Sequence, residues 1–137
     1  MRPVIQLERT GCGIASVAAI TGHSYPKAKA MARTLGISAD DPKLRSETQH
    51  IRKLLKRCGA KPAAREAAFR SWRALPDLAL LAIKWHLERG EHFWHWVVFV
   101  RDATGEYVMD SKPTLKNHRR TDFGRIKPKW YMAVTKS

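Results

Sequence analysis

The segment from Cys12 to Ile20 places the strongest constraint on what this chain can fold into. It contains no charged side chain and would be apolar on every side of a helix, a pattern typical of a helix that is buried all round. Gly22 follows where a glycine commonly ends a helix. A chain of 137 residues can bury such a helix in one core without a disulfide or metal. We therefore expect a single domain spanning residues 1–137.

The residue pattern in the first half of the chain predicts two further amphipathic helices. Ser24 can cap a helix with a proline in its first turn, and the pattern runs to Gly36. The residues Ser46 to Gln49 have the spacing of a capping box. Behind them, apolar residues from Ile51 to Cys58 recur at helical spacing.

The second half of the chain favours strands. Leu78 to Trp85 is a short apolar run, and Trp94 to Val100 is rich in aromatic and β-branched residues. Asp102 to Gly105 has the residue order of a type I turn, so the strand after it, Glu106 to Asp110, completes a hairpin. Trp130 to Val134 is a last candidate strand. Helices first and strands later indicate an α+β fold.

Composition and charge narrow the class of protein. With 44% hydrophobic residues the chain is neither disordered, collagen-like nor a coiled coil, and no apolar run reaches the roughly 18 residues of a membrane span. Two cysteines and no export or lipidation signal indicate a reducing, cytoplasmic setting, with delivery out of the cell by another secretion machine left open. The formal net charge of +14 favours polyanionic or acidic partners.

Cys12 is the first candidate for chemistry, because it stands at the entrance of the buried helix. The free N–H groups and the positive end of a helix stabilise a thiolate. Gly11 and Gly13 would let a substrate backbone approach, and the Cys12 N–H could donate to a developing oxyanion, with the amide of Gln6 beside it. The alternative is that Cys12 only fills space in the core and that Gln6 is an ordinary surface residue.

A nucleophilic cysteine needs a base and a group that orients the base, and the predicted hairpin offers both. With Asp102 to Gly105 as the turn, paired residue numbers sum to 207. His95 then lies opposite Lys112, and Asp110 is its diagonal neighbour on the same face. A turn centred one residue earlier would place His95 and Asp110 directly opposite each other. Either register brings an imidazole to a carboxylate.

Other chemistry-bearing residues are given structural roles. Cys58 belongs to the apolar face of its helix, and Trp94 and Trp96 share the face opposite His95, where they are expected in the core. A zinc site could be imagined from His92, His95 and Cys58, but no close pair of ligand motifs supports it. We therefore predict neither a metal nor another cofactor, and keep His92 as a reserve candidate for the base.

The order of these residues resembles a known family. Gln6, then Cys12-Gly13 at the start of an apolar helix, then His95 to Val98 and Asp110 look like the papain-like cysteine peptidase superfamily. The similarity is greatest to the double-glycine leader peptidase domains of bacteriocin ABC transporters and their stand-alone relatives. It spans roughly Val4 to Pro113. No transmembrane or ATPase segment follows, so processing coupled in cis to a transporter is not expected.

The resemblance implies a papain-like fold and a catalytic role for each matched residue. Cys12 would be the nucleophile, His95 the general base and acid, Asp110 the residue that orients His95, and Gln6 an oxyanion donor. Its substrate would be a peptide or protein amide, attacked through a thioester intermediate. Hydrolysis by a cysteine peptidase, deamidation and acyl transfer remain open, as does a role as a bacterial toxin or effector.

The basic residues support a rival hypothesis from another class. They gather in four stretches: Lys27 to Arg33, Arg52 to Arg57, Arg65 to Arg73 and Lys112 to Lys129. Positive charge alone suffices for phosphate contacts, so a non-catalytic module binding nucleic acid or protein is the alternative, although no nucleic-acid motif accompanies the charge. The same charge would equally attract an acidic inhibitor or immunity protein.

Overall fold

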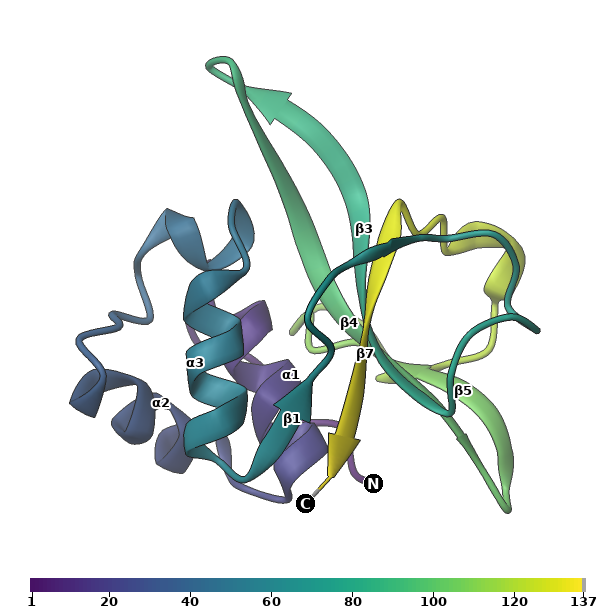
Figure 1. The fold of residues 1–137 in the computed structure, drawn as a ribbon, viewed down its shortest axis with the longest axis horizontal. Coiled ribbons are helices and arrows are strands. Elements are labelled where there is room, and N and C mark those ends of the chain that lie inside the picture. The colour runs from purple at the N-terminus through teal and green to yellow at the C-terminus, as the bar shows by residue number, and fades with distance from the viewer. Residues whose placement is uncertain (137) are drawn as a thin grey trace.

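Three helices form one layer of the protein in the computed structural model, which describes residues 1–136 (Figure 1). The central helix is α1 (Cys12–Thr21), and α2 (Tyr25–Thr34) and α3 (Gln49–Arg57) pack against it. A short 3-10 helix, η1 (Pro42–Arg45), precedes α3. The layer is thus built around the apolar segment that the sequence singles out.

The two N-terminal helices begin and end as their sequences predict. Every residue of α1 from Cys12 to Ile20 is buried, and Gly22 ends the helix in the left-handed conformation with φ 74°, which costs glycine little. Ser24 caps α2 by accepting a hydrogen bond from the Lys27 N–H at 3.2 Å. Burial of α1 on all sides fixes its N-terminal turn firmly in the core.

The start of α3 differs from the predicted capping box. Ser46 is not its cap, because the N–H of Ser46 bonds to the carbonyl of Lys43 at the end of η1. The helix begins at Gln49, and the Glu47 carboxylate accepts from the His50 N–H at 3.0 Å. Ser46 thus belongs to the end of the 3-10 turn, and the Glu47 carboxylate takes over the capping of α3 near the positive end of the helix.

An antiparallel sheet forms the second layer, and its strands follow in the order β1-β7-β3-β4-β5-β6 with β2 pairing β7. The strands are β1 (Ala60–Pro62), β2 (Ala67–Ala68), β3 (Leu78–Glu88), β4 (Glu91–Asp102), β5 (Gly105–Met109), β6 (Arg119–Arg120) and β7 (Trp130–Lys136), with a 3-10 turn, η2 (Phe123–Arg125), before β7. The α+β class is confirmed. The pattern did not predict β1, β2 or β6, which have only two or three residues each.

The hairpin of β3 and β4 is the longest element and projects beyond the rest of the molecule (Figure 1). Its register is regular from Leu78 opposite Val100 to Ile83 opposite His95. There it shifts by a bulge, and pairing resumes at His86. The bulge lies directly beside His95.

The hairpin of β4 and β5 has the first of the two predicted registers. Val98 pairs with Met109 and Asp102 with Gly105, so the paired numbers sum to 207. Continued beyond Met109, this register makes Asp110 a diagonal neighbour of His95. The turn chemistry of Asp102 therefore determines a contact between two residues far along the strands.

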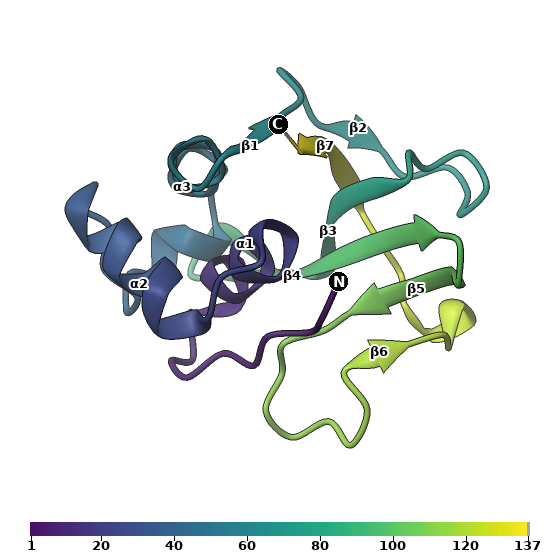
Figure 2. The ribbon, with the colours of Figure 1, turned by 90° about the horizontal axis from the view of Figure 1, so that it is seen from below.

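Side chains of β3 and β4 alternate between two hydrophobic clusters. One face of the sheet, which includes Trp94 and Trp96, packs on the helices, as Figure 2 shows from below. The other face, which includes Val97 and Phe99, packs on the loops around Leu75. Trp94 and Trp96 are 4% and 0% exposed, which confirms their predicted place in the core.

Gly13 is the position where the two layers meet most closely. A Cβ there would clash with Ile51 and would lie 3.1 Å from the Trp96 ring. We expect Gly13→Ala to lower the free energy of unfolding by about 1 to 3 kcal/mol, since a packed core accommodates an added methyl group poorly. Urea denaturation measures this. Gly124→Ala is the control, because nothing lies within 4 Å of its added Cβ; an equal effect of the two changes would contradict the packing interpretation.

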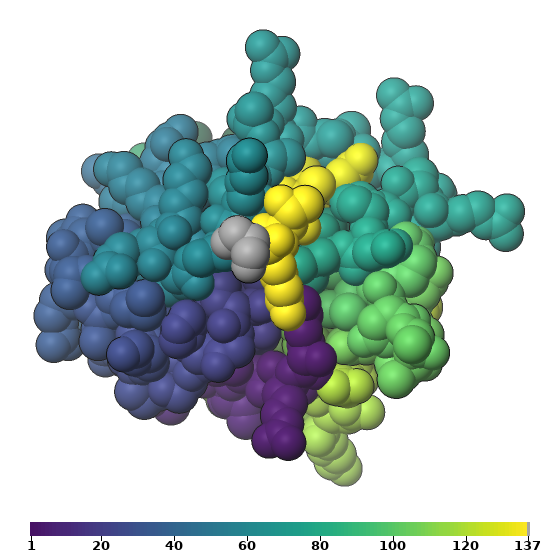
Figure 3. Space-filling view, turned by 60° about the horizontal axis from the view of Figure 1, so that its bottom comes forward, coloured from purple at the N-terminus to yellow at the C-terminus, as the bar shows by residue number. Residues whose placement is uncertain are grey.

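The two ends of the described chain lie close together on one face. Met1 to Val4 and Lys136 line the same shallow hollow, and Figure 3 shows the yellow strand β7 beside the purple N-terminal residues. From there the N-terminal segment crosses to the sheet, where the Gln6 N–H donates to the Ser111 carbonyl at 3.1 Å. Within residues 1–136, no helix has the length and apolar character required to cross a membrane.

Candidate active site

Cys12 is the first residue of α1 and is 1% exposed. Its side chain nevertheless lines the floor of a cleft of about 470 Å³. The backbone N–H of Trp96 on β4 points at the sulfur, with the nitrogen 3.5 Å from Sγ. This contact joins the helical layer to the sheet at the predicted nucleophile.

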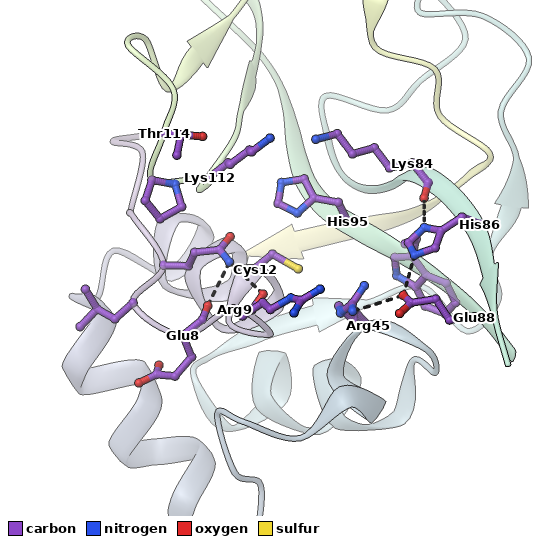
Figure 4. Close-up of a pocket in the computed structure, with 14 residues that line it drawn as sticks. Glu8, Arg9, Cys12, Arg45, Lys84, His86, Glu88, His95, Lys112 and Thr114 are labelled. Atoms are coloured by element: carbon purple, nitrogen blue, oxygen red, sulfur yellow. Dashed lines mark hydrogen bonds and ion pairs between the residues drawn. The ribbon is translucent and has the colours of Figure 1, made fainter.

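His95 and Asp110 meet as the register predicts. The His95 Nε2 lies 2.7 Å from the Asp110 Oδ1, and the His95 ring lies beside the Cys12 sulfur in the cleft (Figure 4). With Nε2–H donating to the carboxylate, the other ring nitrogen, Nδ1, is the one available to the sulfur. The structure therefore brings together the three residues, Cys12, His95 and Asp110, for which the resemblance predicts the roles of nucleophile, base and orienting carboxylate.

Asp110 is held by more donors than His95 alone. It is 1% exposed, and its carboxylate accepts from the Lys112 N–H at 3.1 Å and from the Arg120 guanidinium at 3.0 Å. Strand β6 positions Arg120, because it pairs with the end of β5. Nothing in the sequence separated Arg120 from the other basic residues of its loop, so sequence reasoning missed it.

The charges of the pair stabilise each other. Burial opposes a charged imidazole, but hydrogen bonds to Asp110 and Cys12 outweigh it and raise the pKa of His95 to about 9. Burial likewise opposes a charged carboxylate, but the hydrogen bonds from His95, the Lys112 N–H and Arg120 lower the pKa of Asp110 to about 2. At neutral pH, an imidazolium thus faces the sulfur of Cys12 and a carboxylate lies behind it.

Gln6 lies in the same cleft, but its amide is already engaged. Its Nε2 donates to the carbonyls of Glu8 at 3.0 Å and Arg9 at 3.2 Å, and its Oε1 accepts from the Ser111 hydroxyl at 2.8 Å. In this arrangement Gln6 fixes the turn that leads into Cys12. Its role as an oxyanion donor stays a prediction and requires one of these bonds to be exchanged.

The glycines beside Cys12 have packing roles. A Cβ on Gly11 would clash with the hydroxyl of Tyr25, and one on Gly13 with Ile51. In both cases the added Cβ would meet a packed side chain rather than the open cleft. The prediction that these glycines admit a substrate backbone is therefore replaced by close packing around the first turn of α1.

The cleft has walls from both layers (Figure 4). Its lining includes the following charged or imidazole side chains: Glu8, Arg9, Arg45, Lys84, His86, Glu88, His95 and Lys112. Glu8 bonds to Lys29 and Tyr25 outside the cleft. Sequence reasoning did not single out Arg45 or Lys84, since neither belongs to a recognisable motif.

The remaining candidates lie apart from this arrangement. Cys58 is half-buried with its sulfur 3.6 Å from that of Met31, and burial raises its pKa. His92 is exposed and stacks on the Trp85 ring with centroids 4.6 Å apart. Across residues 1–136, no group of three His, Cys, Asp or Glu side chains is placed to hold a metal ion.

The chain was compared with known proteins at three levels. No protein-family model, no curated protein sequence and no solved structure matches it.

Proposed function

We propose that this protein is a cysteine peptidase-like enzyme with a papain-like fold that attacks peptide or protein amides through Cys12. The observation that carries the proposal is that Cys12 and His95 line one cleft side by side (Figure 4) while the buried Asp110 binds the far side of the His95 ring. Each of the three comes from a different part of the fold, and a core cysteine would need neither the base nor the buried carboxylate.

The chemistry follows from the charges of the site. The imidazolium of His95 and the N-terminal end of α1 both favour a thiolate at Cys12. The thiolate forms a bond to the carbonyl carbon of the amide, and the carbonyl π electrons move to its oxygen. When this intermediate collapses, the C–N bond breaks and His95 transfers its proton to the leaving amine. A thioester remains on Cys12.

The negative oxygen of the intermediate needs a donor close to the sulfur. The N–H of Cys12 lies in the first turn of α1, where backbone N–H groups have no acceptor within the helix. This N–H belongs to the same residue as the attacking sulfur, so it lies close to the carbonyl oxygen that becomes negative. Gln6 holds the turn before it, so the same residue that the resemblance assigns to the oxyanion stabilises the segment that presents this N–H.

The thioester can be released in two ways. Attack by water, deprotonated by His95, gives hydrolysis or deamidation, and attack by an amine gives acyl transfer. All of them begin with the same thiolate. The proposal therefore concerns the reaction type, and the identity of the acceptor is read from the product once a substrate is known. A toxin or effector role would rest on this same chemistry.

The test is the rate at which iodoacetamide alkylates Cys12 as pH is varied. We expect Cys12 to react at about pH 7 at least tenfold faster than Cys58, whose pKa burial raises. Intact mass and peptide mapping assign each modified sulfur. Cys12→Ala should remove the fast phase, and Cys58→Ala should leave it unchanged. If Cys12 reacts only as fast as Cys58, no activated thiolate is assembled, and the basic surface becomes the better guide to function.

A further inference from the structure

The cleft around Cys12 carries positive charge that the catalytic step does not use. Lys84, Lys112, Arg9 and Arg45 all line it. We propose that Lys84 and Lys112 form a subsite for a carboxylate of the substrate, so that the enzyme prefers an amide next to an aspartate or glutamate side chain. This inference rests on the proposed function and assigns its substrate class.

The backbone at Lys84 is held in an unusual conformation that keeps its side chain in the cleft. Lys84 has φ 53°, in the left-handed region that is strained for a residue with a Cβ. It lies in the bulge of β3, next to Ile83, which pairs with His95. The bulge removes Lys84 from the regular ladder and places its side chain at the mouth of the site (Figure 4).

Lys112 completes the pair from the other side of His95. It follows Asp110 by two residues, and its ammonium faces that of Lys84 beside the imidazole (Figure 4). Burial and the neighbouring Lys112 lower the pKa of Lys84. Two ammonium groups brought together at the edge of a cleft repel each other, and an anion between them would relieve that repulsion.

No carboxylate of the protein takes that place. Among the ion pairs of residues 1–136, none includes Lys84 or Lys112. The charge of Asp110 acts on Lys84, but His95 and Arg120 hold its carboxylate.

The acidic residues of the cleft already have partners, Glu8 outside the cleft and Glu88 within it. Glu8 binds Lys29 at 2.6 Å, and Glu88 binds His86 at 2.7 Å and Arg45 at 3.5 Å. The charge left over in the cleft is therefore positive. A substrate carboxylate would meet two ammonium groups within the same space as the reacting sulfur.

Two pairs of alkylating reagents test this without a known substrate. Iodoacetate and iodoacetamide differ by one charge close to the reacting carbon, and bromoacetyl-glycine and bromoacetyl-glycinamide carry the same difference farther away. The rate constant at Cys12 is measured for each reagent in a Cys58→Ala background. The variants are Lys84→Met, Lys112→Met and the double change, with Lys53→Met as control, because Lys53 is exposed on α3 and lies outside the cleft.

The readout is the ratio of the anionic to the neutral rate constant. We expect each cleft lysine variant to lower this ratio about threefold and the double variant about tenfold for at least one reagent pair, as exposed charges contribute modestly. Lys53→Met should leave it unchanged. Equal ratios in all variants for both pairs would overturn the inference. Failure of the proposed function is seen separately, as slow alkylation by both reagents near pH 7, since the ratio remains measurable at higher pH.

Discussion

Alkylation of Cys12 at neutral pH is expected to slow by at least about tenfold when His95 is replaced by alanine. The imidazolium is the positive group beside the sulfur (Figure 4), and the pKa of His95, raised to about 9, keeps it charged at pH 7. Removing it takes away the charge that favours the thiolate, and a free thiol with the ordinary pKa of about 8.5 is only a few per cent thiolate at pH 7. Stopped-flow or quenched alkylation followed by intact mass gives both rates.

His92→Ala is the matched control for this change. His92 lies on the same strand, three residues away, but it is exposed and stacks on Trp85 outside the cleft. We expect its alkylation rate at Cys12 to equal that of the unchanged protein. A similar loss in both histidine variants would show that the strand, rather than the imidazole of His95, determines the reactivity of Cys12.

Replacement of Asp110 by alanine is expected to lower the free energy of unfolding by about 3 to 5 kcal/mol. Its carboxylate is 1% exposed and partners both His95 and Arg120, and removing one member of a buried ion pair leaves the others without compensation. Urea denaturation at about pH 6 measures the loss. Asp122→Ala is the control, because Asp122 pairs with the same Arg120 at 2.8 Å but is 43% exposed, so we expect less than about 1 kcal/mol.

The same pair makes stability depend on pH in a defined way. The contribution of His95, whose pKa rises from 6.5 to about 9 on folding, is complete below pH 6.5 and is lost as the pH rises through 9. The contribution of Asp110, whose pKa falls from 3.8 to about 2, is present above pH 3.8 and is lost as the pH falls through 2. We expect the alkaline loss to be on the order of 2 kcal/mol and to shrink in Asp110→Ala. A flat profile in the unchanged protein would contradict the pairing.

Much of the fold could be predicted because local signals and tertiary packing agree. The uncharged segment of α1 and the stop at Gly22 determine the central helix, and the turn after Asp102 determines the register that joins His95 to Asp110. Both depend on residues close together in sequence. The prediction of a capping box at Ser46 was wrong because Ser46 ends the preceding 3-10 turn, where its N–H bonds to the Lys43 carbonyl. Residue spacing alone does not reveal that this turn competes with the helix for Ser46.

The rest of the site depends on contacts between distant segments. Arg120 reaches Asp110 only because the two-residue strand β6 pairs with β5, and so short a strand has no periodicity to detect. Lys84 enters the cleft through a bulge that shifts the register of β3. The engagement of Gln6 with the turn before Cys12 likewise appears only in three dimensions.

The division of the site between two layers has a consequence for how the protein would lose activity. Cys12 belongs to the helices and His95 to the sheet, and the Trp96 N–H reaches the sulfur across the boundary. Reacting groups lose most of their advantage when they are misplaced by about 1 Å. A slight separation of the layers would thus abolish the proposed chemistry while every helix and strand was still intact. The alkylation rate of Cys12 would then report sensitively on whether the helical layer is packed on the sheet.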